Sequence, residues 1–181
     1  KVPNPMNLTI DELLEKSNVQ VLNFASRFML GTDLGKPLVD KVLPDVKKII
    51  SSPESENYDY SLAGQLYIGK QVKISEEHIA ESEGLQELKA AIEAMSTAYV
   101  ERFISKAFKG KKHFKGKAEL HDIWANEQKA GDWNPLHGHN TPSPAGLSGV
   151  FYIESPEHLL EDQIKTQDCH GWIQIVHGTQ V

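Results

Sequence analysis

Two histidines one residue apart, His137 and His139, are the residues of this chain with the clearest potential for chemistry. They belong to the stretch GDWNPLHGHNTPSPAGLSGVFYI, residues 131–153, which ends in an apolar run. In an extended segment, residues i and i+2 point to the same side of the backbone. Two imidazole nitrogens at this spacing would converge on one point, and a metal ion is the group that such nitrogens commonly share. The pattern predicts a metal site at the edge of a β-layer, with two loop histidines that are solvated or bonded to the backbone as the alternative.

The composition predicts one globular domain without a general attraction to polyanions. The chain has 181 residues, 24% of them charged and 39% hydrophobic, which suits a domain with a substantial core. Its formal net charge of −6 argues against nucleic acid as a partner. The basic run KGKKHFKGK, residues 109–117, is predicted to be a solvated loop rather than a phosphate-binding patch.

Cysteine use and hydropathy bear on the compartment. Cys169 is the single cysteine, so an internal disulfide is excluded and a reducing compartment is favoured. No apolar stretch approaches the roughly 18 residues of a membrane span, and the first residues, KVPNPMNLTI, lack the apolar core of a signal peptide. We therefore expect a cytoplasmic protein that does not enter a membrane.

Residues 1–117 form a part that is predicted to be rich in helix. The segment TIDE, residues 9–12, has the pattern of a capping box that begins a short helix. The segment VQVLNFASRFML, residues 19–30, is apolar, and its periodicity does not decide between strand and helix. Two further helices are predicted from apolar residues spaced three or four apart, the first with Pro44 as a potential kink. These apolar residues are Leu34, Leu38, Val42, Val46 and Ile49 in the first helix, and Leu85, Leu88, Ile92, Met95, Tyr99 and Phe103 in the second.

Residues 118–181 are predicted to be rich in strand. The strand candidates are AELHDIWAN at 118–126, LSGVFYI at 147–153 and GWIQIVHG at 171–178, separated by turns with Gly, Pro and Asn. Short strands around glycines are also predicted within residues 61–74. Helices followed by many short strands indicate an α+β fold, with the helices packed on one face of a β-sandwich or barrel.

The sequence around the two histidines resembles a known family of enzymes. The residues that carry the likeness are WANEQKAGDWNPLHGH, 124–139, and LSGVFYIESP, 147–156. They are similar to the central motif of the iron(II)- and 2-oxoglutarate-dependent oxygenases of the prolyl-hydroxylase-like kind, above all to a subfamily from marine bacteria and phages. The resemblance implies a double-stranded β-helix, a jelly-roll or cupin-like fold, with packed N-terminal helices. Residues 1–181 would then be a single domain, with the first strands of the β-helix in 118–181.

The resemblance also implies a set of metal ligands. Gly131 lies six residues before His137, as a glycine does before the first iron-binding histidine of such enzymes. His137 then takes the first ligand position, and His139 stands where these enzymes usually have an aspartate. His177 is a candidate for the third ligand, although its run reads better as an intermediate strand. We therefore expect the natural chain to continue beyond Val181 with more strands, a metal-binding histidine and a basic residue for 2-oxoglutarate.

Three further residues are assigned by the resemblance to the binding of 2-oxoglutarate. Gln128 stands where a tyrosine often contacts this cosubstrate, and Ser148 and Tyr152 match residues of a strand that lines its pocket. Ser148 and Tyr152 are four residues apart, so a strand would place them on one face; a barrel core is the alternative. His121, on the strand before the motif, is expected either in the core or in the pocket lining.

The activity implied by the resemblance is that of an oxidoreductase, a dioxygenase that hydroxylates an unidentified small molecule or peptide. Iron(II) would be its cofactor and 2-oxoglutarate its cosubstrate, and no catalytic residue beyond the metal ligands is predicted. Because His139 replaces the usual carboxylate, a three-histidine dioxygenase that uses no 2-oxoacid is one alternative. A cupin-like metal-binding or structural module without turnover is the other.

Overall fold

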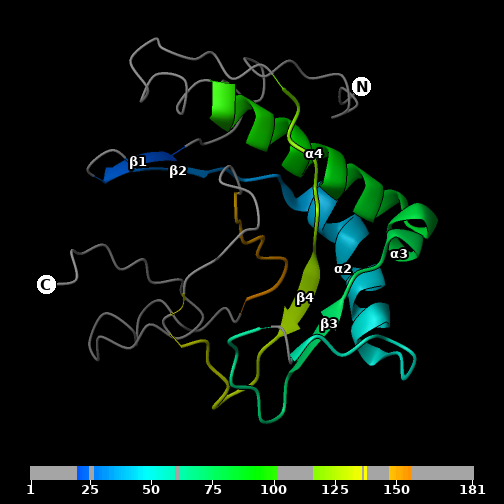
Figure 1. Ribbon diagram of the computed structural model, residues 1–181. Helices are drawn as coiled ribbons and strands as arrows, with labels where there is room; N and C mark the ends of the chain where they lie inside the picture. The colour runs from blue at the N-terminus through cyan, green and yellow to red at the C-terminus, as the bar shows by residue number, and fades with distance from the viewer. Residues whose placement is uncertain are drawn as a thin grey trace, which may run out of the picture.

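The computed structural model describes residues 20–24, 27–59, 62–101, 116–135, 137 and 147–155. The elements are, in chain order, β1 (Gln20–Phe24), β2 (Arg27–Gly31), α2 (Lys36–Ser51), β3 (Lys70–Lys73), α3 (Glu76–Glu81), α4 (Glu83–Tyr99) and β4 (Trp124–Glu127). Figure 1 shows α2 and α3 beside the β3–β4 pair, with α4 crossing above them. This part of the chain has a mixed α/β architecture in which helices cover one side of a small sheet.

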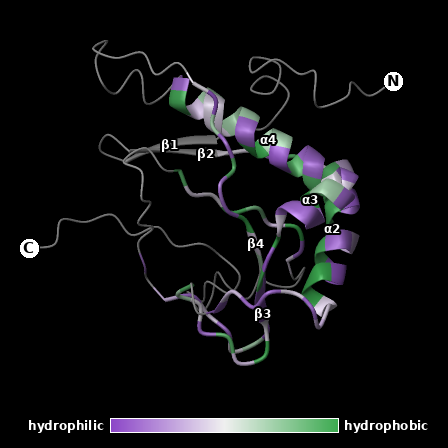
Figure 2. Ribbon diagram, turned by 45° about the vertical axis from the view of Figure 1, so that its right-hand side comes forward, coloured by the Kyte–Doolittle hydropathy of each residue, from purple (hydrophilic) through white to green (hydrophobic). Residues whose placement is uncertain are grey.

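Helix α2 forms as the apolar spacing predicts. Gly35, at a φ of 82°, precedes the helix, Pro37 lies in its first turn, and the helix continues through Pro44 to Ser51. Its buried residues are Val42, Val46 and Ile49, as expected from the repeat. Figure 2 shows hydrophobic residues on the side of α2 that is turned toward the sheet and hydrophilic residues on the other side.

Helix α4 begins at a side-chain cap and crosses α2 at short range. The Ser82 hydroxyl accepts a hydrogen bond from the backbone N–H of Leu85 at 3.0 Å and donates one to Asp45 Oδ2 at 2.5 Å. A Cβ at Gly84 would lie 2.9 Å from the carbonyl group of Lys41, so this glycine permits the close approach of the two helices. The cap and the glycine together set where α4 meets α2.

Strands β3 and β4 form an antiparallel ladder that links the two halves of the chain. Val72 lies opposite Ala125, and both side chains are buried against the helices. The neighbouring pair, Gln71 and Asn126, lies on the other face of the ladder because successive side chains of a strand alternate. The opposite edge of β3 bonds residues 56–58, through Tyr58 N to Gln71 O and Lys73 N to Glu56 O.

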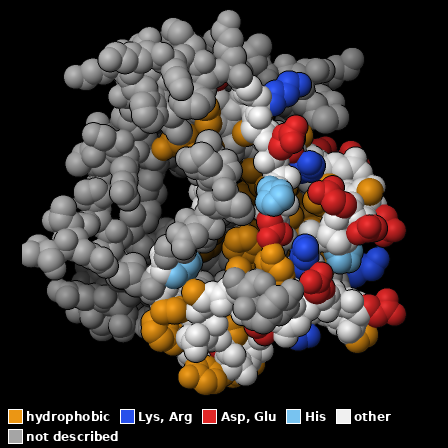
Figure 3. All heavy atoms as spheres, in the orientation of Figure 1, with side chains coloured by type: hydrophobic (Ala, Val, Ile, Leu, Met, Phe, Trp, Pro, Cys, Tyr) orange, Lys and Arg blue, Asp and Glu red, His pale blue; other side chains and the backbone are white. Residues whose placement is uncertain are grey.

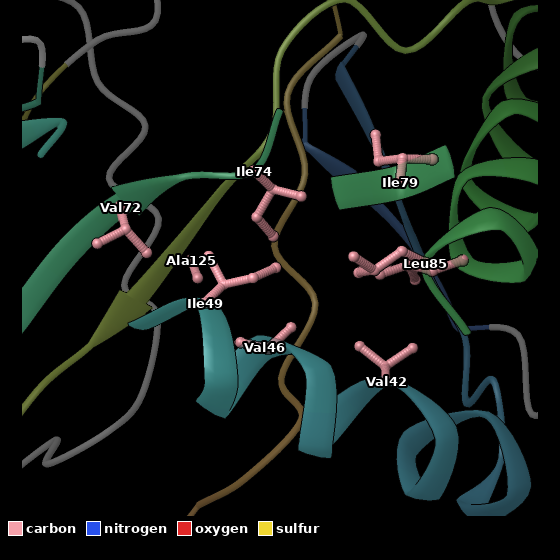
Figure 4. Close-up of a cluster of buried hydrophobic side chains, with 9 residues drawn as sticks. Val42, Val46, Ile49, Val72, Ile74, Ile79, Leu85 and Ala125 are labelled. Atoms are coloured by element: carbon pink, nitrogen blue, oxygen red, sulfur yellow. The ribbon is translucent and has the colours of Figure 1, made fainter. Parts of the chain in front are cut away.

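The core lies between α2, the first turns of α4 and the inner face of the β3–β4 ladder, as the close-up in Figure 4 shows. The buried side chains that form it are those of Val42, Val46, Ile49, Val72, Ile74, Ile79, Leu85, Leu88 and Ala125. Phe151 and Ile153 pack against this cluster from the segment 147–155. Burial of this apolar surface is the main stabilising contribution to the arrangement of the elements around the candidate site.

The segment for which the periodicity was ambiguous forms a hairpin. β1 and β2 pair in antiparallel fashion, with Val21 opposite Leu30 and Phe24 opposite Arg27. Only two residues separate the strands, so pairing follows directly from chain reversal. The capping box predicted at residues 9–12 lies outside the described residues.

The strands of the second part agree with the prediction only partly. β4 overlaps the strand predicted at 118–126 but covers Trp124–Glu127 alone, and residues 116–123 are irregular. The strand predicted at 147–153 is wrong, because no ladder pairs with these residues in the described part of the chain. The described residues contain two separate two-stranded sheets and no evident double-stranded β-helix; residues 156–181, where further strands were predicted, lie outside them. The β-helix therefore stays a prediction.

None of the described helices is both long and apolar enough to cross a membrane.

Candidate functional site

A tight turn follows β4 and leads toward His137. Gly131 adopts a φ of 93°, a conformation that side-chain-bearing residues rarely take, and the backbone N–H of Asp132 donates to Lys129 O at 2.9 Å. Trp133 then pairs with Gln65 through two backbone hydrogen bonds, Gln65 N to Trp133 O at 2.8 Å and Trp133 N to Gln65 O at 3.2 Å. The approach to His137 is thus held against the loop that precedes β3.

The carboxylate of Asp132 is the centre of this turn. Its Oδ1 accepts hydrogen bonds from Tyr67 N at 2.6 Å and Ile68 N at 3.2 Å. Its Oδ2 accepts from Gly69 N at 2.8 Å and Lys129 N at 2.8 Å. We call this arrangement, Asp132 with the amides of Tyr67, Ile68, Gly69 and Lys129, the Asp132 clamp.

The clamp lowers the pKa of Asp132 to about 2. The bond from Lys129 N has the largest effect, the three other amides act in the same direction, and partial burial opposes them. Hydrogen bonds from backbone N–H groups favour the charged form of a carboxyl group, which is why the pKa falls. Asp132 is therefore ionised at neutral pH. The ionised form suits its contacts, because both oxygens must accept hydrogen bonds from the four amides.

This low pKa predicts acid sensitivity of the clamp. A group whose pKa is lower in the folded state stabilises the protein above its unfolded pKa, here about 3.8, and this stabilisation is lost as the pH falls toward about 2. We expect the difference in urea midpoint between the wild type and Asp132→Asn to shrink as the pH falls through that window. The matching difference for the uncharged change Leu85→Ala should stay constant, and parallel behaviour of the two variants would contradict the prediction.

Sequence reasoning did not single out Asp132. The signal was present, because an aspartate directly after a turn glycine often accepts bonds from nearby amides. Three of its four donors, however, come from a loop about sixty residues earlier in the chain, and their approach is not visible in the sequence.

The loop residues held by the clamp carry exposed apolar side chains. Tyr67 is 82% exposed, and Ile68 and Trp133 are exposed as well. This loop and the turn after β4 lie at the lower end of the β3–β4 pair in Figure 1, where Figure 3 shows hydrophobic side chains at the surface. The turn that leads to His137 is thus bordered by an apolar surface, while the helical side of the molecule is largely charged.

His137 is exposed, and its ring is oriented by a local contact. Nδ1 lies 2.7 Å from the backbone oxygen of Pro135. A carbonyl oxygen can only accept, so Nδ1 is the donor in this contact, and the contact orients the ring. A contact between one ring nitrogen and a backbone carbonyl is common among metal-binding histidines, and it equally fits a loop histidine that is bonded to the backbone.

The other predicted metal ligands, His139 and His177, lie outside the described residues. Among the residues that are described, no three His, Cys, Asp or Glu side chains come together as a metal site. Of the predicted ligand set, therefore, only His137 has a described position.

The residues assigned to 2-oxoglutarate lie on exposed positions. Gln128 follows the end of β4, and Ser148 and Tyr152 belong to the segment 147–155, in which Phe151 and Ile153 pack against the core. Tyr152 is half exposed, and partial burial raises the pKa of its phenol group. No hydrogen bond joins Gln128, Ser148 and Tyr152 to one another within the described residues, so their common role stays a prediction.

His121 lies outside the core. It is exposed and lines a groove of about 280 Å³ at the junction of β3, α3 and the residues before β4. The polar residues of this groove include Lys73, Glu76 and Asp122. Asp122 accepts a hydrogen bond from the Tyr58 hydroxyl, and Lys73 Nζ lies 5.5 Å from the centre of the Tyr58 ring. These interactions join the groove to Tyr58.

No protein-family model, no curated protein and no solved structure matches this chain.

Proposed function

We propose that this protein is an iron(II)- and 2-oxoglutarate-dependent oxygenase that hydroxylates a small molecule or a peptide. The observation that carries the proposal is the H-x-H pair, in which the ring of His137 is oriented by its contact with Pro135 O. The resemblance of residues 124–156 to oxygenases of this type supports it. When bound, iron(II) would supply the redox chemistry that couples the decarboxylation of 2-oxoglutarate to the oxidation of a C–H bond.

The roles of the residues follow from this proposal. His137 binds the metal through Nε2, and His139, two residues further along the chain, is the second ligand. His177 is the candidate for the third ligand. Gln128, Ser148 and Tyr152 contact 2-oxoglutarate; a phenol hydroxyl is protonated at neutral pH, so that of Tyr152 is able to donate to a cosubstrate carboxylate.

The test is the conversion of 2-oxoglutarate to succinate by the purified natural protein with added iron(II). Succinate formation that requires both iron and oxygen supports the proposal. Oxygen consumption without succinate would point to a three-histidine dioxygenase, the reading that a histidine in place of the usual carboxylate favours. Metal binding without any turnover would point to a cupin-like binding module instead.

The variant His139→Asp tests the second ligand. The change restores the two-histidine, one-carboxylate set that is typical of these iron sites, so we expect iron affinity to be kept or increased. Because a proton competes with the metal for each imidazole, the variant should also bind iron with a weaker pH dependence than the wild type. Isothermal titration with iron(II) across a series of pH values measures both effects.

The control for this variant is His121→Asp, which makes the same change of charge at an exposed histidine of the groove. It should leave the affinity and its pH dependence unchanged. If His139→Asp abolishes binding while His137 remains essential, His139 is not a ligand.

A further inference from the structure

The Asp132 clamp joins two segments that are far apart in the chain. Its four donors are the amides of residues 67–69, in the loop before β3, and of Lys129, in the turn after β4. Gly69 packs so closely here that a Cβ would lie 1.9 Å from Glu127 O and 2.6 Å from Asp132 Oδ2. The carboxylate thus occupies a site shaped by backbone on both sides, and a side chain at residue 69 would displace it.

Asp132 lies five residues before His137 in the chain, and contacts of the described residues 133–135 restrict the segment between them. Trp133, next to Asp132, is paired with Gln65 by two backbone hydrogen bonds. Asn134 precedes a proline, which restricts its backbone, and Pro135 has a fixed φ. Pro135 also supplies the carbonyl oxygen that contacts His137 Nδ1. A shift of the turn would therefore move both the histidine and the group that orients its ring.

We infer that Asp132 is a positioning residue for the metal site, holding the segment 129–135 in the place from which His137 reaches the metal. This inference rests on the proposed function, because it takes His137 to be a ligand of the proposed metal site. Asp132 itself does not contact the metal, because its two oxygens are already engaged by four amides. Its effect acts through the backbone between the clamp and His137.

The variant Asp132→Asn breaks the clamp with almost no change of shape. An asparagine keeps one acceptor oxygen and turns an NH₂ group toward two amides that also donate, so two of the four bonds are lost. Loss of a group that orients a metal ligand typically costs about 10–100-fold in metal affinity. We expect the affinity of the full natural protein for cobalt(II), used alone as the probe, to fall by about tenfold or more.

The readouts separate positioning from general destabilisation. The visible absorption of bound cobalt(II) reports the geometry of its ligands, and we expect this spectrum to change in Asp132→Asn. The matched control is Ser82→Ala, which removes the cap of α4 and lowers the melting temperature without touching the turn. Ser82→Ala should keep both the affinity and the spectrum of the wild type.

Two further measurements keep the inference testable should Asp132→Asn fold poorly. Gly69→Ala opens the same clamp from its other side without a change of charge, and it should reduce cobalt affinity in the same way. In the wild type, linkage requires that metal binding in turn slows hydrogen exchange at the amides of Tyr67, Ile68 and Gly69.

The outcomes distinguish this inference from the proposed function. Two results would overturn the positioning role without contradicting the proposed iron site. One is a folded Asp132→Asn variant that keeps the cobalt affinity and spectrum of the wild type. The other is hydrogen exchange at the amides of residues 67–69 that does not change when the metal binds. A wild-type protein that binds no metal at all would refute the proposed function itself. Reduced affinity, an altered spectrum and an unaffected Ser82→Ala together would establish Asp132 as a positioning residue.

Discussion

We expect His137→Ala to abolish iron(II) binding and succinate formation while leaving the fold intact. Nε2 of His137 is the ligand in the proposed site, and loss of a ligand should exceed the roughly 10–100-fold effect of losing a supporting group. The side chain is exposed and contributes nothing to the core, so the melting temperature should stay at the wild-type value. Iron titration, succinate assay and thermal unfolding measure the three quantities.

His121→Ala is the matched control for this prediction. It removes the same side chain from another exposed position, in the groove beside β3 and α3. Iron binding by this variant should equal that of the wild type. An unchanged iron stoichiometry in His137→Ala would remove the basis of the proposed function.

The second large effect concerns stability: Leu85→Ala should lower the free energy of unfolding by about 2–5 kcal/mol. Leu85 is 2% exposed and lies in the first turn of α4, where it packs into the cluster formed with α2 and β3. Truncation leaves a cavity that the crossing of α2 and α4 cannot close, because Gly84 already brings the helices into contact with Lys41. Urea-induced unfolding followed by circular dichroism measures the change.

Leu147→Ala offers the same chemical change at a position that is 41% exposed. Substitutions at such surface positions usually alter stability by less than about 0.5 kcal/mol. Equal losses for the two variants would show that the cluster around Leu85 is not the core of the protein.

Several features of this protein were determined by the sequence alone. Helices α2 and α4 follow from apolar residues spaced three or four apart, and buried residues such as Val42 and Leu85 are among those that the spacing marks. Such periodicity is a local property: one face of a helix must be apolar for the helix to pack, whatever it packs against. The H-x-H pair was found in the same way, because the spacing of two histidines is enough to suggest a shared ligand.

Strands depend on partners that the local sequence does not contain. The segment 147–153 has the apolar composition of a strand, yet it forms no ladder in the described part of the chain, although Phe151 and Ile153 still pack on the core. Residues 19–30 could not be assigned from periodicity, and the hairpin of β1 and β2 became clear only from their pairing. A strand is defined by hydrogen bonds to a neighbour, so composition alone does not establish it.

The support of the candidate site was decided by tertiary structure. Asp132 and Tyr67 are 65 residues apart in the chain, and they meet because β3 and β4 pair and bring the preceding loop onto the following turn. The orientation of the His137 ring likewise depends on where the Pro135 carbonyl points, which residue types do not reveal. The sequence by itself thus singled out His137 and His139 as candidate metal ligands, because that choice depends on residue type and spacing. Only the three-dimensional contacts decided how the turn that leads to His137 is held, because three of its four donors come from a distant part of the chain.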